Sequence, residues 1–257
     1  MEKRVTAAAE PHIERQDRIA EVGTLTLLRH GQSEWNRDGR FTGWADVGLS
    51  EAGVAEAERA GRLLARDAPP VDSCFTSMLR RATSTSEIVL RECGRRHVSV
   101  EEHWRLNERH YGALQGMRVW PAVRRYGPIA VLRCRREFRV RPPALPATDP
   151  RSVANDPRYA SLAAEDLPHG ESVADTQARL LPYWRERIAP EIARGRHVLV
   201  VSHKNTLRAL LKMLRRATSR DIPPFAIVNG APLVLTFEAQ DLWILGSTDV
   251  AAQRGHP

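Results

Sequence analysis

Two histidines stand where buried strands are expected to end. His30 follows the apolar run 24–28, and His203 follows the apolar run 197–202. Parallel strands bring their carboxyl ends to one edge of a sheet, so we expect the two imidazoles to meet there. A neutral imidazole nitrogen is a competent nucleophile toward phosphorus near pH 7, whereas a serine hydroxyl first needs a base of its own.

Arginines and a carboxylate accompany these histidines. Arg29 precedes His30, and Arg81 and Glu108 follow the next two expected strands. Guanidinium groups can stabilise the charge that spreads over the equatorial oxygens of a phosphoryl group in transfer. A carboxyl group can pass a proton to or from the reacting oxygen. The combination predicts a phosphate pocket with an acid/base group beside it, in which Gly31 lets the backbone come close to the ligand.

Alternating strands and helices are predicted around these positions. We expect strands at 24–28, 72–76, 97–100 and 197–202, helices at 51–67, 78–92 and 205–216, and a final strand pair at 232–237 and 242–245. Ser50 is the expected cap of the first helix, and Val54 belongs to its expected apolar face. This order predicts an α/β three-layer sandwich with a mostly parallel central sheet and helices on both faces.

A different region separates the two βα halves. Residues 118–138 are polar and expected to be helical, and residues 139–168 contain six prolines. A long proline-bearing connection inside a compact domain is more often an active-site insertion than a separate domain. We therefore predict a single domain over 24–257 with a helical and loop cap inserted at about 113–170.

Composition sets outer limits on the function. With 257 residues, 42% of them hydrophobic, the chain can bury a sizeable core. Its 27% charged residues, together with the lack of a low-complexity tract and of an apolar run near the roughly 18 residues of a membrane span, exclude a transmembrane or disordered protein. Residues 1–23 are polar and lack the apolar centre of a secretory signal, so we expect a cytoplasmic protein. Two explanations stay open for this leader: a disordered extension, or an upstream start codon.

The formal net charge of +8 leaves two kinds of partner open. A surplus of arginine suits nucleic acid, and it also suits small anions, because a guanidinium can grip phosphate or carboxylate with two parallel hydrogen bonds. The arginines are scattered along the chain, which argues against a nucleic-acid surface. Three cysteines form no CxxC pair, so neither a disulfide framework nor a cysteine zinc site is expected.

Three longer motifs surround the positions named above: RHGQSEWN at 29–36, FTGW at 41–44 and NERHYGALQG at 107–116. Together with shorter matches between 76 and 234, they resemble the cofactor-dependent phosphoglycerate mutases of the histidine phosphatase superfamily. RHG alone would indicate only the superfamily, whereas the other two motifs are specific to the mutase branch. The resemblance covers nearly the whole chain, from about Thr24 to Ala252.

The resemblance implies a role for each site residue. His30 would carry the phosphoryl group as phosphohistidine, and Glu108 would be the general acid/base. The groups that would bind the phosphoryl being transferred are Arg29, Asn36, Arg81 and His203. The residues that would hold the rest of the substrate are Thr42, Gly43, Arg109, Tyr111, Arg135, Arg136 and Asn205.

The resemblance also implies a reaction. In the family, 2,3-bisphosphoglycerate primes the histidine, and the phosphoenzyme gives its phosphoryl group to 3-phosphoglycerate. The bisphosphate then returns its other phosphoryl group and leaves as 2-phosphoglycerate, a step of glycolysis and gluconeogenesis. No metal, nucleic acid or membrane is implied, and a homodimer would fit the family.

Alternatives remain for single residues. Glu108 could simply pair with Arg109, and the arginines at 133–136 could form a solvated helical face. Cys134 lies among those arginines, where nearby cations could lower the pKa of its thiol, although we expect an unreactive cysteine.

The sequence departs from the family pattern at three places. Lys204 replaces a glycine after the second histidine, Val119 replaces a substrate-binding lysine, and the tail 246–257 is short. Our hypothesis is that Lys204 or Arg118 supplies the cation that Val119 lacks. The alternative is that the Lys204 side chain points to solvent and only its backbone amide serves the ligand. The short tail predicts faster hydrolysis of bisphosphoglycerate, because water is less well excluded.

These departures keep two other functions open. The first is a divergent paralogue that acts as a phosphatase, or as a mutase on another phosphorylated small acid. The second is a non-catalytic module that binds anions or nucleic acid. It would form no acid-labile phosphate, and its binding would weaken steeply with salt.

Overall fold

A five-stranded sheet organises the computed structural model, which describes residues 23–215 and 227–237. The strands lie in the order β3-β2-β4-β1-β5, with bounds Val100–Glu102, Ser73–Thr76, Val198–Ser202, Thr24–Arg29 and Pro232–Thr236. Strands β1 to β4 run parallel, and β5 pairs antiparallel with β1. The predicted α/β fold with a mostly parallel sheet is confirmed.

The register of the two central strands determines where the histidines lie. Strand β1 pairs with β4 so that Leu28 is opposite Val201 and Arg29 is opposite Ser202. His30 and His203 are the next residues on these strands, and the His30 amide still donates to the Ser202 carbonyl at 3.0 Å. The two rings therefore leave the sheet side by side.

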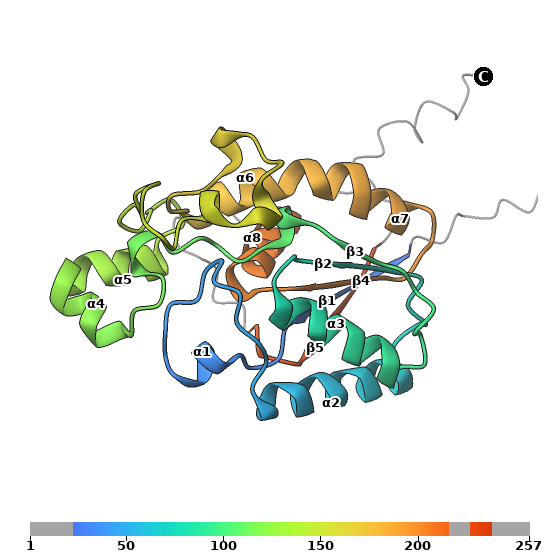
Figure 1. Cartoon of the computed structure of the whole chain (residues 1–257). Coiled ribbons are helices and arrows are strands. Elements are labelled where there is room, and N and C mark those ends of the chain that lie inside the picture. Colours follow the sequence, from blue (N-terminus) through green and yellow to red (C-terminus); the bar gives the residue numbers. More distant parts are fainter. Residues whose placement is uncertain (1–22, 216–226, 238–257) are drawn as a thin grey trace, which may run out of the picture.

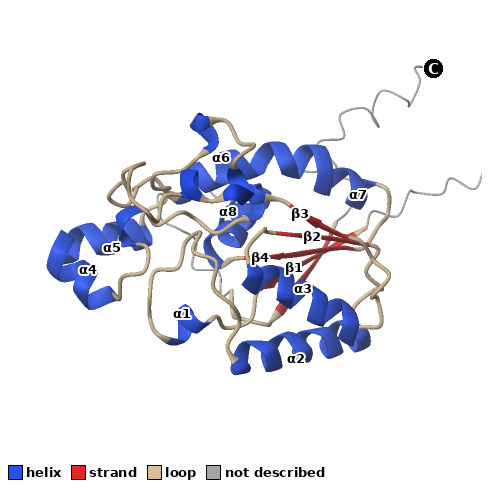
Figure 2. Cartoon of the chain, viewed as in Figure 1, coloured by secondary structure: helices blue, strands red, loops and turns tan. Residues whose placement is uncertain are grey.

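Helices cover both faces of the sheet (Figure 2). Helices α2 (Glu51–Asp67) and α3 (Arg80–Glu92) lie on one face. Helices α6 (Val173–Tyr183), α7 (Ala189–Ala193) and α8 (Lys204–Leu214) lie on the other. Because successive strand residues point to opposite faces, Leu25 and Leu27 pack toward α6 and α8 while Leu28 packs toward α2 and α3.

Helix α2 packs directly against the turn that follows β1. The side chain of Ser50 accepts from the Gly53 amide and caps this helix as predicted. A Cβ atom on Gly31 would lie 2.1 Å from the Gly53 carbonyl oxygen. Gly31 is therefore required by the approach of the turn to α2, which corrects the expectation that it makes room for a ligand. Val54 was expected on the buried face and is 37% exposed.

The region between the two βα halves forms a pair of helices and a series of short turns. Helices α4 (Val119–Tyr126) and α5 (Pro128–Arg136), which we call the cap helices, lie beyond α1 (Glu34–Arg37) and away from the sheet (Figure 1). Gly127, with φ of 83°, separates them. The short 3₁₀ turns are Trp104–Leu106, Gly112–Leu114, Val153–Asn155, Pro157–Tyr159 and Ala164–Asp166, and a π-helical turn spans Trp184–Ile188.

Some expected boundaries differ from the structure. The strand expected at 97–100 begins only at Val100, after a turn in which the Val98 amide donates to the Arg95 carbonyl. The expected strand 242–245, the tail 246–257 and the leader 1–22 lie outside the described residues. Among the described helices, none is long and apolar enough to span a membrane.

Candidate active site

His30 presents one ring nitrogen for chemistry. Its Nδ1 lies 2.6 Å from the Gly31 carbonyl oxygen, which can only accept, so Nδ1 carries the proton and Nε2 keeps its lone pair. The ring is buried, and its pKa is lowered well below the usual value by burial and by the cations Arg81 and Arg29. His30 is therefore neutral at pH 7, the state that a nucleophile needs.

His203 is held through the opposite ring nitrogen. Its ring centroid lies 4.9 Å from that of His30, and its Nε2 lies 2.7 Å from the Ser77 hydroxyl. That hydroxyl already accepts from the Leu79 amide at 3.2 Å, so its own proton is available for Nε2. The ring proton of neutral His203 then belongs on Nδ1, a buried atom without a partner among the described residues.

Two arginines present further buried donors. Arg81 uses Nη1 and Nη2 to bind the carbonyls of Ala45 and Gly43, at 2.9 and 2.8 Å. Arg29 donates from Nη1 to the Ile227 carbonyl at 3.2 Å. Burial lowers the pKa of Arg81 to about 10, so it remains a cation at pH 7.

These groups leave three buried N–H donors without a partner in the described part of the chain: Arg29 Nε, Arg81 Nε and His203 Nδ1. A buried donor without a partner costs about 1–3 kcal/mol, and an anion is the ligand that best satisfies several such donors. The donors come from β1, α3 and the residue after β4; Arg29 and Arg81 line the same cavity as His30, and the His203 ring centroid lies 4.9 Å from that of His30. This is the geometry of a phosphate site with a nucleophile beside it.

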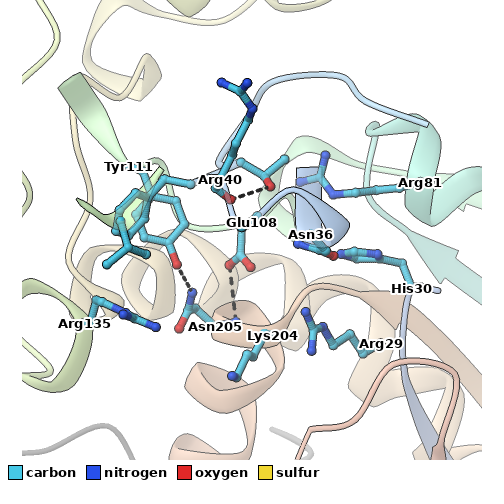
Figure 3. Close-up of a pocket in the computed structure, with 14 residues that line it drawn as sticks. Arg29, His30, Asn36, Arg40, Arg81, Glu108, Tyr111, Arg135, Lys204 and Asn205 are labelled. Carbon is cyan, nitrogen blue, oxygen red and sulfur yellow. Dashed lines mark hydrogen bonds between the residues drawn. The ribbon is translucent and has the colours of Figure 1, made fainter. Parts of the chain in front are cut away.

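Glu108 stands between the two sides of the pocket (Figure 3). Its Oε1 accepts from the backbone amides of Arg109, at 2.8 Å, and Asn205, at 3.3 Å. The guanidinium of Arg109 instead donates to the Cys134 carbonyl at 2.8 Å. The hydrogen bond between Glu108 and Arg109 thus uses the Arg109 backbone amide, and the Glu108 carboxyl group stays in the pocket wall.

A cavity of about 210 Å³ joins Arg29, His30, Arg81 and Glu108, whereas His203 is not among the residues that line it. Ten of the expected site residues line it: Arg29, His30, Asn36, Thr42, Arg81, Glu108, Tyr111, Arg135, Lys204 and Asn205. In Figure 3, Arg29, His30 and Arg81 lie on one side of Glu108, and Tyr111 and Arg135 lie on the other. The Tyr111 hydroxyl accepts from Asn205 Nδ2 at 3.0 Å, which connects the second side to α8.

Three expected substrate contacts do not line the cavity. Arg109 is buried beneath the Tyr111 ring, with its guanidinium carbon 4.5 Å from the ring centroid. Arg136 is exposed at the end of α5. Gly43 takes a positive φ of 56° and serves through its carbonyl, which Arg81 binds. Arg109 and Arg136 therefore lie outside the lining of the cavity, and their contact with substrate stays a prediction.

Other pocket residues were missed by sequence reasoning. Gly39, Arg40 and Phe41 line the cavity beside Thr42. Arg208 is not among the lining residues, but it lies one helical turn after Lys204, is about half-buried, and interacts electrostatically with Glu108. The position of Arg40 next to the FTGW motif, and the four-residue spacing of Lys204 and Arg208, are signals that could have identified both cations.

The departures at 119 and 204 meet in this cavity. Val119 and Lys204 both line it, and Lys204 is half-buried. Burial and the nearby cations Arg208 and Arg29 lower the pKa of the Lys204 amine. Arg118, the other expected source of a cation, is exposed and outside the lining. Lys204 therefore belongs to the wall of the cavity, whereas Arg118 does not.

Cys134 is buried in the packing of the cap helices. Burial raises the pKa of its thiol, against the opposing effect of Arg109. The thiol is therefore expected to be unreactive, in agreement with the simpler interpretation of its sequence context.

Comparison with known proteins agrees with this geometry. The sequence model of the histidine phosphatase superfamily (branch 1) matches residues 25–156 and 149–249. A 2,3-bisphosphoglycerate-dependent phosphoglycerate mutase of Nitratidesulfovibrio vulgaris is 49% identical over 84% of this chain and 86% of the relative. A protein of the same name from Hamiltonella defensa is 43% identical over 91% of this chain and 95% of the relative.

A solved structure is also similar. A mycobacterial glucosyl-3-phosphoglycerate phosphatase, crystallised with VO3, superposes with a TM-score of 0.65. It is 26% identical in sequence and covers 86% of this chain and 94% of its own.

Proposed function

The chain belongs to the histidine phosphatase superfamily and, within it, to the 2,3-bisphosphoglycerate-dependent phosphoglycerate mutases, and from this premise we infer that it interconverts 3-phosphoglycerate and 2-phosphoglycerate. The observation that carries the proposal is the free Nε2 of neutral His30 beside the buried donors of Arg29, Arg81 and His203. The enzyme is an isomerase that moves a phosphoryl group by way of its own histidine.

The pocket fits a bisphosphorylated primer in its chemistry. His30 Nε2 attacks a phosphorus atom of 2,3-bisphosphoglycerate, the P–O ester bond breaks, and the oxygen that leaves takes a proton from Glu108. When the phosphoryl group returns, the hydroxyl of monophosphoglycerate gives its proton back to Glu108 and attacks phosphohistidine. The donors of Arg29, Arg81 and His203 hold the equatorial oxygens throughout, each contributing about 1.5–3 kcal/mol.

Lys204 provides the finer proposal about substrate binding. Lys204 lines the cavity with Val119, whose side chain cannot bind an anion, and we assign the Lys204 amine to the substrate carboxylate or second phosphate. Arg135 would share this role from the cap helices. Metal independence, a homodimer and the absence of a nucleic-acid partner stay predictions.

A mutase assay tests the proposal against the phosphatase alternative. We expect 3-phosphoglycerate to be converted to 2-phosphoglycerate, with a rate that depends on added 2,3-bisphosphoglycerate and exceeds the release of inorganic phosphate. Phosphate release without isomerisation would instead indicate a phosphatase. The similar mycobacterial protein is named as a phosphatase. Binding of the substrate with neither product would indicate a non-catalytic module.

A pair of variants tests the role of Lys204. In Lys204→Gly we expect the KM for 3-phosphoglycerate to rise about tenfold, because one charge-assisted hydrogen bond is worth about 1.5 kcal/mol or more. Arg118→Gly is the matched control, since Arg118 is exposed and outside the cavity lining. Equal kinetics of Lys204→Gly and the wild type would remove the proposed role.

A further inference from the structure

An ion pair outside the pocket lining joins helix α6 to the segment just before it. Arg179 Nε lies 2.7 Å from Glu171 Oε1, and the side chains are only 9% and 6% exposed. A buried ion pair is weak support for stability in itself, because desolvation of both charges opposes their attraction. The other hydrogen bonds of Arg179 and Glu171, to the backbone around Glu108, indicate a second role.

The guanidinium of Arg179 gathers backbone carbonyls from the loop that carries Glu108. Its Nη1 donates to the Arg105 carbonyl at 2.6 Å, and its Nη2 donates to the carbonyls of Asn107 and Glu108 at 2.8 and 3.0 Å. The Arg105 carbonyl belongs to the 3₁₀ turn Trp104–Leu106, and those of Asn107 and Glu108 lie in the irregular backbone just after it, outside any strand. One side chain thus fixes the path of the chain into Glu108.

Glu171 holds the backbone that follows Glu108. Its Oε2 accepts from the His110 amide at 2.8 Å. The Glu108 carbonyl also accepts from the indole Nε1 of Trp44 at 2.6 Å. The backbone is therefore held before, at and after Glu108, so that the direction of its side chain into the pocket follows from these contacts.

We propose that Arg179 and Glu171 are positioning residues for Glu108: they orient the loop so that the Glu108 carboxyl group reaches the oxygen that gains or loses a proton. Neither residue lines the cavity. The inference rests on the proposed function, since it assigns the reacting proton to Glu108. A misplacement of about 1 Å can reduce a rate by about 100-fold, which sets the size of the expected effect.

A double-mutant cycle tests this role. In Arg179→Gln we expect kcat to fall about 10- to 100-fold while KM changes less than about threefold, because Arg179 touches no substrate. In a Glu108→Gln background, Arg179→Gln should have almost no further effect on kcat, since the group that it positions is already gone. Arg141→Gln is the matched control, because Arg141 forms an exposed ion pair with Asp175 of the same helix.

The outcomes separate this proposal from the proposed function. A wild type that lacks mutase activity overturns the proposed function, whereas an equal loss of kcat in both backgrounds overturns only the positioning role. Glu171→Gln, which keeps the shape of Glu171, is taken through the same cycle in case Arg179→Gln does not fold. If neither variant folds, the pair is purely structural and the positioning role is overturned.

Discussion

The two sides of the pocket are built in different ways. The sheet side, formed by Arg29, His30, Arg81 and His203, lies at the ends of strands and the start of α3, and two of its four side chains are no more than 1% exposed. The cap side, formed by Arg40, Tyr111, Val119 and Arg135, lies on loops and the cap helices, and its arginines are exposed.

The two sides of the pocket are therefore expected to have different roles in catalysis. On the sheet side, backbone carbonyls and the Ser77 hydroxyl hold each donor, so the geometry around the phosphoryl group is fixed before the substrate binds. On the cap side, long side chains reach the cavity from the surface, where a single substitution changes one contact. We therefore expect the sheet side to control kcat and the cap side to control KM and substrate choice.

Removal of Arg81 should have the largest effect. In Arg81→Met, the phosphoryl group loses a cation and the carbonyls of Gly43 and Ala45 lose their donor. Steady-state kinetics should show kcat reduced by about 1,000-fold or more. Arg80→Met is the matched control, because its neighbouring guanidinium is exposed and pairs with Asp46. A decrease of less than about tenfold relative to this control would contradict a dominant sheet side.

Ser77→Ala tests the tautomer of His203. Without the hydroxyl donor at Nε2, the ring proton is free to move to that nitrogen, and Nδ1 then turns a lone pair toward the phosphoryl oxygens. We expect kcat to fall about 10- to 100-fold with little change in KM, the loss of one charge-assisted hydrogen bond. Ser73→Ala, which removes a surface contact to Glu191, provides the baseline. An unchanged kcat would show that Ser77 does not set the tautomer.

Arg135→Ala should separate the two sides most clearly. Arg135 lines the cavity from the cap helices, so its removal should raise the KM for 3-phosphoglycerate about tenfold and leave kcat within about twofold. The neighbouring Arg136→Ala should match the wild type, because Arg136 is exposed and outside the lining. A larger rise of KM in Arg136→Ala than in Arg135→Ala would contradict this prediction, because Arg136 and not Arg135 would then be the arginine that contacts the substrate.

The smallest expected effect concerns stability and pH. The folded pKa values of His30 and His203 lie well below the usual value, so below about pH 6.5 the unfolded chain binds protons at these positions that the folded chain does not. The free energy of unfolding should therefore fall as pH falls, by up to about 1.4 kcal/mol per pH unit for each group. Urea unfolding at pH 7.5 and 5.5 measures this change in the free energy of unfolding.

The variant His30→Gln/His203→Gln should lose part of that slope, because both buried imidazoles are gone. His110, whose pKa burial lowers to about 4, retains a contribution of the same sign. A variant with the full slope of the wild type would show that the two site histidines are not neutral in the folded protein.

The sheet side could be predicted from sequence because apolar runs ending in RH and SH mark buried strands and their ends. The cap side could not: the sequence predicts one helical region over 118–138 and misses the break between α4 and α5 at Gly127. Whether Arg135 or Arg136 faces the cavity depends on how those helices pack. The Arg179 contacts were equally hidden, because its partners besides Glu171 are backbone carbonyls, which carry no sequence signal. Gly31 was expected to let the backbone approach a ligand, whereas its close neighbour is Gly53, which only the tertiary structure brings near.

Covalent labelling of His30 tests the account most directly. The protein is mixed with 2,3-bisphosphoglycerate carrying labelled phosphate, quenched, and examined for acid-labile label on the chain, beside His30→Ala. We predict label on the wild type and none on His30→Ala, because Nε2 of His30 is the nitrogen left free in the pocket. Equal labelling of both proteins, or of neither, would contradict the central claim that the phosphoryl group passes through His30.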